Sequence, residues 1–307
     1  MPSNSRKLLA AATVMAALLP LSACGGDPMS GGGSGDTSTI TIGSANFPEN
    51  ELLAEMYAQA LEAKDIEVER KFNIGARELY LKALEDGSID LLPEYNGALL
   101  AALSEGGEVP QDIAEPQEVY DALQDVLPKG TETLEQSEAE DKDTLTVTQE
   151  TATKYDLESI DDLKPVAGQL SLAAGPEFAK RYQGVVGLEE LYDVKFKEFK
   201  PLDPGGPLTK AALAKGDVEV ANIFSTDSAI ETENLVVLED TKNLFLAQNI
   251  VPLVRSSDVN DDVKDALNEV SAALTTENLT EYLAKVQVDK QDSATVATEF
   301  LEANDIG

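Results

Sequence analysis

Strand-like and helical segments alternate over residues 39–95, and this order constrains the fold more than any other feature of the chain. Apolar residues recur at every second position in the strand-like runs and at helical spacing between them. The strand-like runs are 39–42, 66–72 and 88–92, and the helical runs start near Pro48 and Arg77. Strands joined by helices in this order predict a parallel sheet covered by helices.

A second alternating series starts near Thr144, and a helical pattern returns from Val259 onward. We therefore predict an α/β protein with two lobes, joined by two crossings near residues 140–145 and 245–250. Lobe I comprises 39–142 plus 249–307, and lobe II comprises 143–248. Ligands of such sheets bind outside the carboxyl ends of the strands. The loops 43–50, 73–77 and 93–96 should converge there on one cleft.

The balance of charged side chains excludes several classes of function. The chain has 57 acidic and 23 basic residues, a formal net charge of −34, and no histidine. A surface this acidic repels nucleic acid. Without imidazole, histidine-dependent nucleophilic catalysis and histidine-ligated metal sites are unavailable. The acidic pairs 161–162, 189–190 and 261–262 fit solvated helix faces better than a glycosidase pair. We expect no catalytic residue, no cofactor and no metal.

The N-terminus has the pattern of a bacterial lipoprotein signal. Arg6 and Lys7 precede an apolar run over 8–21, which is shorter than the about 20 residues of a spanning helix. The following Leu-Ser-Ala-Cys, ending at Cys24, resembles the lipobox, whose cysteine becomes the lipid-bearing N-terminus. Residues 25–38 are rich in glycine and serine and suit a flexible tether. We predict a signal peptide over 1–23, a lipidated tether over 24–38, and anchoring at the extracytoplasmic face of the cell membrane.

Four separated motifs carry a resemblance to one family. Residues 43–50 read Gly-Ser-Ala-Asn-Phe-Pro-Glu-Asn, and residues 87–97 include Ile-Asp-Leu-Leu-Pro-Glu-Tyr-Asn-Gly. Residues 202–209 read Leu-Asp-Pro-Gly-Gly-Pro-Leu-Thr, and 216–227 end in Asn-Ile-Phe-Ser-Thr-Asp. In order and spacing these segments resemble the extracytoplasmic osmoprotectant-binding proteins, the glycine betaine, choline and carnitine receptors of ABC importers. The resemblance extends from about residue 40 to residue 300.

The resemblance implies a periplasmic-binding-protein fold that closes on a small solute at a hinge and then docks on the permease subunits of the importer. In the family, aromatic faces hold the quaternary ammonium by cation–π attraction. Tyr95 matches one such position, and Phe224 stands where tyrosine is usual. Gln248 replaces another tyrosine, and the segment 142–145 lacks an aromatic residue that the family has.

The side of the site that holds the ligand carboxylate also departs from the family. Arg181 matches an arginine that pairs with this carboxylate, whereas Ala45 replaces a lysine and Ala98 a hydroxyl residue. Several polar residues near the strand ends would suit a ligand with more hydrogen-bonding groups. The ligand-binding residues that we predict are Asn46, Asn50, Arg77, Tyr95, Asn96, Arg181, Phe224, Thr226 and Gln248.

Alternatives remain open at this point. Because the aromatic cage is incomplete, the receptor could take a different polar or aromatic small molecule. A carboxylate-dependent extracytoplasmic hydrolase is the second alternative, because carboxylates are the abundant catalytic groups left. A lipoprotein sensor that reports ligand state to a membrane partner is the third.

Overall fold

The computed structural model describes residues 39–110, 113 and 115–307. The predicted signal peptide, Cys24 and the tether lie outside the described residues.

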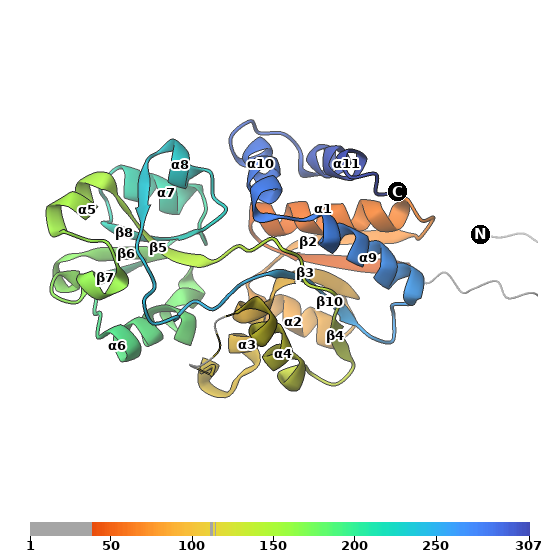
Figure 1. Cartoon of the computed structure of the whole chain (residues 1–307), viewed down its shortest axis with the longest axis horizontal. Helices are drawn as coiled ribbons and strands as arrows, with labels where there is room; N and C mark the ends of the chain where they lie inside the picture. The colour runs from red at the N-terminus through yellow and green to blue at the C-terminus, as the bar shows by residue number, and fades with distance from the viewer. Residues whose placement is uncertain (1–38, 111–112, 114) are drawn as a thin grey trace, which may run out of the picture. The chain divides into compact units, whose positions relative to one another are not determined.

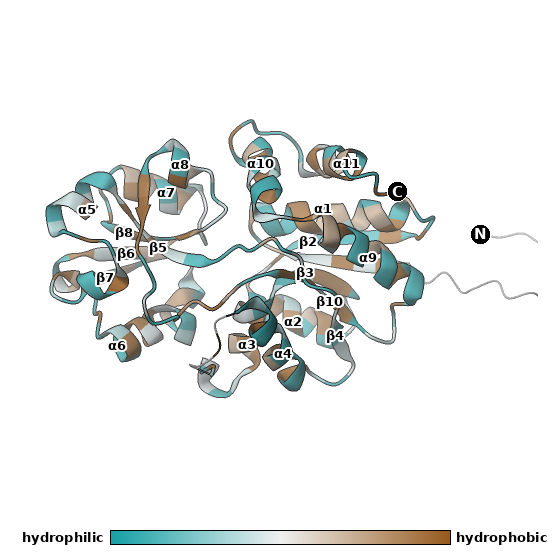
Figure 2. Cartoon of the chain, viewed as in Figure 1, coloured by the Kyte–Doolittle hydropathy of each residue, from teal (hydrophilic) through white to brown (hydrophobic). Residues whose placement is uncertain are grey.

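A mixed five-stranded sheet with the order β2-β1-β3-β10-β4 forms the first lobe (Figure 1). Strand β1 pairs in parallel with β2 and with β3, whereas β10 runs antiparallel to β3 and to β4. The strands are β1 (Ile40–Ala45), β2 (Val68–Gly75), β3 (Leu91–Tyr95), β4 (Thr131–Thr133) and β10 (Ile250–Arg255). The parallel strands confirm the predicted alternation. The antiparallel strand β10, which is hydrophobic along most of its length (Figure 2), comes from the far end of the chain.

The second lobe repeats this plan with the strand order β7-β6-β8-β5-β9. Strand β6 is parallel to β7 and β8, and β5 is antiparallel to β8 and β9. The strands are β5 (Asp143–Thr148), β6 (Ser171–Ala174), β7 (Glu198–Pro201), β8 (Val220–Phe224) and β9 (Leu235–Val237). Two sheets with their own hydrophobic cores confirm the predicted two-lobed α/β fold class.

The first lobe has seven α-helices among the described residues (Figure 1). They are α1 (Pro48–Glu62), α2 (Arg77–Glu85), α3 (Asn96–Leu103), α4 (Pro116–Val126), α9 (Asp261–Ala273), α10 (Thr276–Gln287) and α11 (Ser293–Ala303). Helix α1 is buried on nearly every side, because α9 and α11 lie across its outer face; Leu267 and Phe300 share one core with Leu52. The helix begins at Pro48. Proline fits the first turn because an N–H group there would have no hydrogen-bond partner within the helix.

Shorter helices cover the second sheet. The α-helices are α5 (Gln149–Tyr155), α6 (Gly187–Tyr192), α7 (Pro207–Ala214) and α8 (Ala229–Thr232). Between β6 and α6 the chain forms a 3-10 turn over Pro176–Ala179 and a π-helical turn over Tyr182–Val186. This irregular segment follows the carboxyl end of β6 and therefore lies at the edge of the sheet where ligands bind.

The chain passes twice between the two sheets. It leaves β4 at Thr133 and enters β5 at Asp143, and it leaves β9 at Val237 and enters β10 at Ile250. The two connecting segments contact each other, because the backbone N–H of Asp141 donates to the carbonyl of Gln248 at 3.1 Å. Side-by-side crossings of this kind suit a hinge, since a few residues there can absorb a rotation of one lobe against the other.

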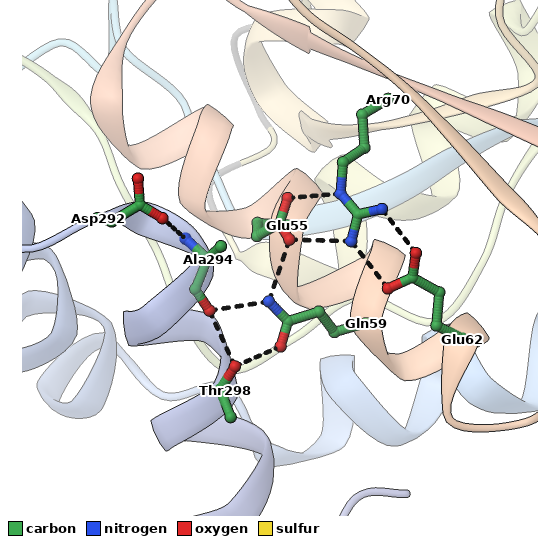
Figure 3. A network of polar contacts seen from close by, with 7 residues as sticks. All are labelled: Glu55, Gln59, Glu62, Arg70, Asp292, Ala294 and Thr298. Carbon is green, nitrogen blue, oxygen red and sulfur yellow. Dashed lines mark hydrogen bonds and ion pairs between the residues drawn. The ribbon is translucent and has the colours of Figure 1, made fainter.

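A polar network fixes the C-terminal helix α11 to the middle of α1 (Figure 3). Arg70 on β2 donates two hydrogen bonds to Glu55 on α1, each 2.9 Å long, and also bridges to Glu62. Gln59 donates to Glu55 and to the backbone carbonyl of Ala294 at the start of α11. Glu55 is only 5% exposed, and a buried carboxylate is costly unless it is paired. The guanidinium of Arg70 supplies the opposite charge.

Within the part of the chain that the structure describes, every helix is too short or too polar to cross a bilayer.

Candidate functional site

A cleft of about 330 Å³ is lined by residues from both lobes. Three of its walls come from the carboxyl ends of β1, β2 and β3 and the residues that follow them, as the parallel-sheet rule predicted, through Phe47, Arg77 and Tyr95. The second lobe contributes the irregular segment after β6 and the end of β8, through Arg181 and Phe224. The volume lies at the lower end of the roughly 300–1,000 Å³ typical of small-molecule sites.

Three aromatic rings form one cluster in the cleft. The ring centroids of Phe47 and Tyr95 are 6.1 Å apart, and those of Phe47 and Phe224 are 5.2 Å apart. Phe47 and Tyr95 belong to the first lobe and Phe224 ends β8 of the second. The cluster therefore offers aromatic faces from both sides of the gap. Tyr95 and Phe224 were predicted as site residues, whereas Phe47 was quoted only as part of a motif.

A glycine makes room for the ring of Phe224. Gly205 has a φ of +58°, and a Cβ built on it would lie 2.8 Å from a ring carbon of Phe224. Any side chain at this position would therefore both strain the backbone and collide with the ring. The following turn is held by Asp203, whose carboxylate accepts the backbone N–H groups of Leu208 and Thr209. The Gly-Gly motif thus positions an aromatic wall of the cleft.

Arg77 is held rigidly at the cleft wall by an internal carboxylate. Its Nε and Nη2 donate to the two oxygens of Glu94 at 2.7 and 3.0 Å, and the Tyr80 hydroxyl donates to the same carboxylate at 2.7 Å. Glu94 is fully buried. Burial alone would lower the pKa of the Arg77 guanidinium, but the charge and hydrogen bonds of Glu94, together with the nearby Tyr80 and Asp143, raise that pKa.

Arg181 bridges the two lobes at the cleft. Its Nε and Nη2 donate to Glu78 of α2 at 3.1 to 3.2 Å. The side chain of Arg181 is 33% exposed and that of Glu78 is 60% exposed, so this pair lies at the solvent side of the cleft. Arg181, predicted to contact the carboxylate of a ligand, is thus occupied by a carboxylate of the chain itself.

Asp143 also lines the cleft, and its carboxylate accepts hydrogen bonds from side-chain amides. Asp143, the first residue of β5, accepts a 2.9 Å hydrogen bond from Nδ2 of Asn222 on the neighbouring strand β8. Gln248, on the second crossing, donates to the other oxygen of Asp143 at 3.4 Å. The prediction included Gln248 but neither Asp143 nor Asn222.

The side-chain nitrogen Nε2 of Gln183 has no hydrogen-bond partner among the described residues, although the residue is only 6% exposed. Gln183 lines the cleft from the π-helical turn, where its backbone leaves helical geometry with a ψ of 59°. The amide nitrogen is a hydrogen-bond donor, and a buried donor without an acceptor costs free energy. Gln183, which the sequence did not single out, is therefore a candidate contact for a polar ligand group.

A buried acid cluster lies beside the aromatic rings and joins the lobes. Thr226, which follows β8, donates through its hydroxyl to Glu49 of α1 at 2.5 Å, and its backbone N–H donates to Asp141 on the first crossing at 3.0 Å. The Tyr95 hydroxyl also donates to Glu49, at 2.8 Å. No cation contacts these two carboxylates within the described residues, and both are at least 97% buried.

The environment of this cluster favours protonated acids. Burial raises the pKa of Glu49, although hydrogen bonds from Thr226 and Tyr95 oppose it. Burial, followed by the charge of Glu49, raises the pKa of Asp141 well above its usual value. Two buried carboxyl groups in one cluster cannot both ionise at low cost. The cluster therefore holds a proton at a pH where an exposed carboxyl group has lost it.

The remaining predicted residues occupy different places. Asn46 lines the cleft beside Phe47. Asn50 accepts the backbone N–H of Ala45 at 2.7 Å and donates to the carbonyl of Pro93, so it ties two strand ends together. Asn96 accepts the backbone N–H of Asn249 at 2.9 Å, which connects α3 to the second crossing. Neither Asn50 nor Asn96 is among the residues that line the cleft.

The geometry of this site agrees with what comparison with known proteins shows. Residues 38–303 match the model of a family described as the substrate-binding domain of ABC-type glycine betaine transport systems. The chain belongs to this family: it is an extracytoplasmic substrate-binding protein of an ABC importer for quaternary ammonium osmoprotectants, and it binds rather than catalyses.

Individual relatives agree over nearly the whole chain. The carnitine transport binding protein OpuCC of Listeria monocytogenes is 26% identical, with 90% of each chain covered. The glycine betaine-binding protein YehZ of Escherichia coli is 25% identical, with 86% of this chain and 90% of that protein covered.

Solved structures show the same fold. A structure described as a glycine betaine/carnitine/choline ABC transporter aligns with a TM-score of 0.67 at 24% identity, covering 87% of this chain and 99% of the other. An ABC-transporter choline-binding protein in complex with choline aligns with a TM-score of 0.63 at 15% identity, covering 87% and 89%. These structures confirm the predicted two-lobed periplasmic-binding-protein fold.

Proposed function

We propose that this protein captures one quaternary ammonium solute of the glycine betaine, choline and carnitine class between its lobes, and delivers it to the permease subunits of its importer. The aromatic cluster of Phe47, Tyr95 and Phe224 carries the proposal, because both lobes contribute rings to it. A quaternary ammonium group has no N–H to donate, so protein hydrogen bonds cannot hold it. Aromatic faces attract it by cation–π interaction, at roughly 0.5–2 kcal/mol for each contact.

The same cluster couples binding to closure. A ligand that contacts Phe47 and Phe224 together binds the closed arrangement better than the open one, since opening moves Phe224 away. The bond between Thr226 and Glu49 and the pair of Arg181 with Glu78 lie on the same interface and form only when the lobes meet. The closed form is then the one that the permease receives.

The chain is held at the extracytoplasmic face of the membrane by acyl groups on Cys24, and residues 25–38 form the tether. The lipobox-like sequence before Cys24 supports this part of the proposal. It is tested by fractionation of cells that produce the wild type or Cys24→Ser. The wild type should sediment with membranes and the variant should be released; equal membrane association of both would contradict lipid anchoring at Cys24.

The ligand class is tested by a thermal-shift screen of the full chain carrying Cys24→Ser. The screen contains glycine betaine, choline, carnitine, amino acids, sugars and aromatic polyols. A ligand at 100 times its Kd adds about 2.7 kcal/mol of stability. We expect a shift with at least one quaternary ammonium compound, and loss of most of that shift in Tyr95→Ala and Phe224→Ala. Phe199→Ala, on β7 away from the cleft lining, is the matched control.

A second candidate ligand class, a polar or aromatic molecule without a quaternary ammonium group, is favoured by one observation. The unpartnered amide of Gln183 and the amide of Gln248 add hydrogen-bonding groups that a bare trimethylammonium ligand cannot use. A shift produced by a sugar, an amino acid or an aromatic polyol, and by no quaternary ammonium compound, would support this second class.

A further inference from the structure

The two arginines that line the cleft are already matched by carboxylates of the same chain. Arg77 forms a two-point contact with Glu94, which is fully buried and leaves no room for exchange with solvent. Arg181 forms a similar contact with Glu78 across the lobes. A carboxylate on a ligand would therefore meet two guanidinium groups whose charge is neutralised, and it would have to displace Glu78 to reach Arg181.

The negative groups of the cleft are less well matched. Asp143 is held by the amides of Asn222 and Gln248, and no lysine or arginine of the described chain lies within ion-pair distance of it. Its charge helps to raise the pKa of the Arg77 guanidinium, but that guanidinium is already bound to Glu94. Lys180 and Glu177, which also line the cleft, contribute one charge of each sign. Beyond these matched charges, the cleft is lined by the carboxylate of Asp143 and by Asp141 of the buried acid cluster, so acidic groups are in excess.

Resting on the function proposed above, we propose that this cleft selects a quaternary ammonium cation without a carboxylate, such as choline, because Glu78 occupies Arg181 and Asp143 faces the cation. Glu78 acts as a built-in carboxylate that takes the place a zwitterion's own carboxylate would need. The amide nitrogen Nε2 of Gln183, which has no hydrogen-bond partner among the described residues, can donate to the oxygen of a neutral hydroxyl group on the ligand.

The rest of the molecule supports the same preference. The chain carries a formal net charge of −34, so its long-range field attracts a cation and exerts no comparable pull on a neutral zwitterion. The two alanines in the cleft lining, Ala45 and Ala98, offer a ligand carboxylate no side-chain donor. The preference for a cation thus has a long-range component and a contact component.

The test is isothermal titration calorimetry of the full chain carrying Cys24→Ser, with choline and with glycine betaine as separate ligands. We expect choline to bind at least about tenfold more tightly. Asp143→Asn should weaken choline binding by about tenfold and change betaine binding much less, so the ratio of the two affinities moves toward unity. Glu78→Gln should strengthen betaine binding by about threefold and leave choline binding nearly unchanged, because this pair is partly exposed.

Glu189→Gln, on the exposed face of α6, is the matched control and should leave both affinities unchanged. Thermal unfolding of each variant shows whether it folds; Glu78→Gln alters an exposed side chain and carries the test if Asp143→Asn does not fold. Tighter betaine than choline binding by the wild type would overturn this inference and leave the proposed function standing, as would an affinity ratio that Glu78→Gln does not change. Absence of binding by choline, betaine and carnitine would overturn the proposed function and this inference together.

Discussion

Helix α1 carries two buried carboxylates, Glu55 and Glu49, whose hydrogen-bond partners differ in kind. Glu55, in the middle of the helix, receives two hydrogen bonds from Arg70, and Gln59 links it to α11 (Figure 3). Glu49, in the first turn, contacts no cation among the residues that the structure describes; it accepts hydrogen bonds from the hydroxyl groups of Tyr95 and of Thr226 in the other lobe. Both residues are at most 5% exposed, so burial does not distinguish them.

The difference lies in whether the partner belongs to the same lobe. Arg70 and α11 share a lobe with Glu55, and an ion pair inside one body can be well compensated because its geometry never changes. Thr226 moves with the second lobe, and a contact that forms and breaks at each ligand cycle must not leave a bare buried charge. Hydroxyl groups and a shared proton satisfy Glu49 at lower cost when the lobes separate. We interpret the Glu55 network as a fixed anchor and the Glu49 cluster as a reversible one.

The largest effect should come from breaking the fixed anchor with Arg70→Met, which leaves Glu55 buried without its cation. We expect a loss of about 2–3 kcal/mol in the free energy of unfolding, below the roughly 3–5 for a fully buried pair because Arg70 is 32% exposed. Urea titration measures the loss, and ligand affinity should stay unchanged. Lys71→Met, whose ion pair is exposed, is the control. A large loss of affinity in Arg70→Met would show that the anchor takes part in binding.

Breaking the reversible anchor with Thr226→Val should affect binding more than stability. The variant keeps the shape of the side chain and removes the hydroxyl that reaches Glu49, so the closed state loses a charge-assisted contact between lobes. We expect about a tenfold loss of ligand affinity, measured by calorimetry. Thr232→Val removes a hydroxyl that bonds only within α8, and it should bind like the wild type. Equal affinity in Thr226→Val would mean that this bond does not stabilise the ligand-bound state.

The contributions of the Arg70 network and of the Glu49 cluster to the free energy of unfolding should change with pH in opposite directions. The hydrogen bond from Arg70 lowers the pKa of Glu62, so that contribution to stability is present above the ordinary carboxyl range and is lost as pH falls through the lowered pKa. The pKa values of Glu49 and Asp141 are raised, because burial disfavours their charged forms. Their contribution is complete below the ordinary carboxyl range and is lost as pH rises through the raised values.

Asp141→Asn separates these two responses. The variant should lose less stability than the wild type as pH rises, by about 1.4 kcal/mol for each unit of pKa shift removed. Its loss of stability as pH falls should match that of the wild type. Glu62→Gln should do the reverse, with a smaller change because this side chain is 42% exposed. Urea titrations across a pH series measure both. A wild-type alkaline slope in Asp141→Asn would contradict a shared proton in the cluster.

The smallest effect should come from Tyr95→Phe, which keeps the ring and removes the hydroxyl that reaches Glu49. We expect ligand affinity to fall by only a few fold, because a single hydrogen bond contributes about 1 kcal/mol. Thermal-shift titration with the best ligand measures it, and Tyr120→Phe, whose hydroxyl contacts the backbone near β4, is the control. A complete loss of binding in Tyr95→Phe would mean that the hydroxyl, rather than the ring, holds the ligand.

Much of the cleft was predictable because it depends on strand order. Residues at the carboxyl ends of parallel strands must meet at one edge, and Asn46, Arg77 and Tyr95 line the cleft there. Asn50 and Asn96 also lie near the carboxyl ends of these strands, but their side chains form hydrogen bonds to backbone groups and connect loops. Sequence position alone does not tell a loop-fixing amide from a ligand-binding one.

The missed residues depend on contacts that no local pattern encodes. Asp143 meets Asn222 because β5 runs antiparallel to β8, a pairing between residues 79 positions apart. Gln183 lines the cleft because its backbone leaves helical geometry in a π-helical turn. Phe47 was visible in its motif, and its position directly after the first strand was the signal that could have identified it.

A solute held by aromatic faces from both lobes is the central feature of the proposed function, and nuclear magnetic resonance of the bound ligand tests it most directly. Choline labelled with ¹³C in its methyl groups is added to the full chain carrying Cys24→Ser. We predict that the bound methyl protons move upfield and show Overhauser contacts to the rings of Phe47 and Phe224, one from each lobe. Bound methyl groups without an upfield shift, or with contacts to the rings of only one lobe, would contradict it.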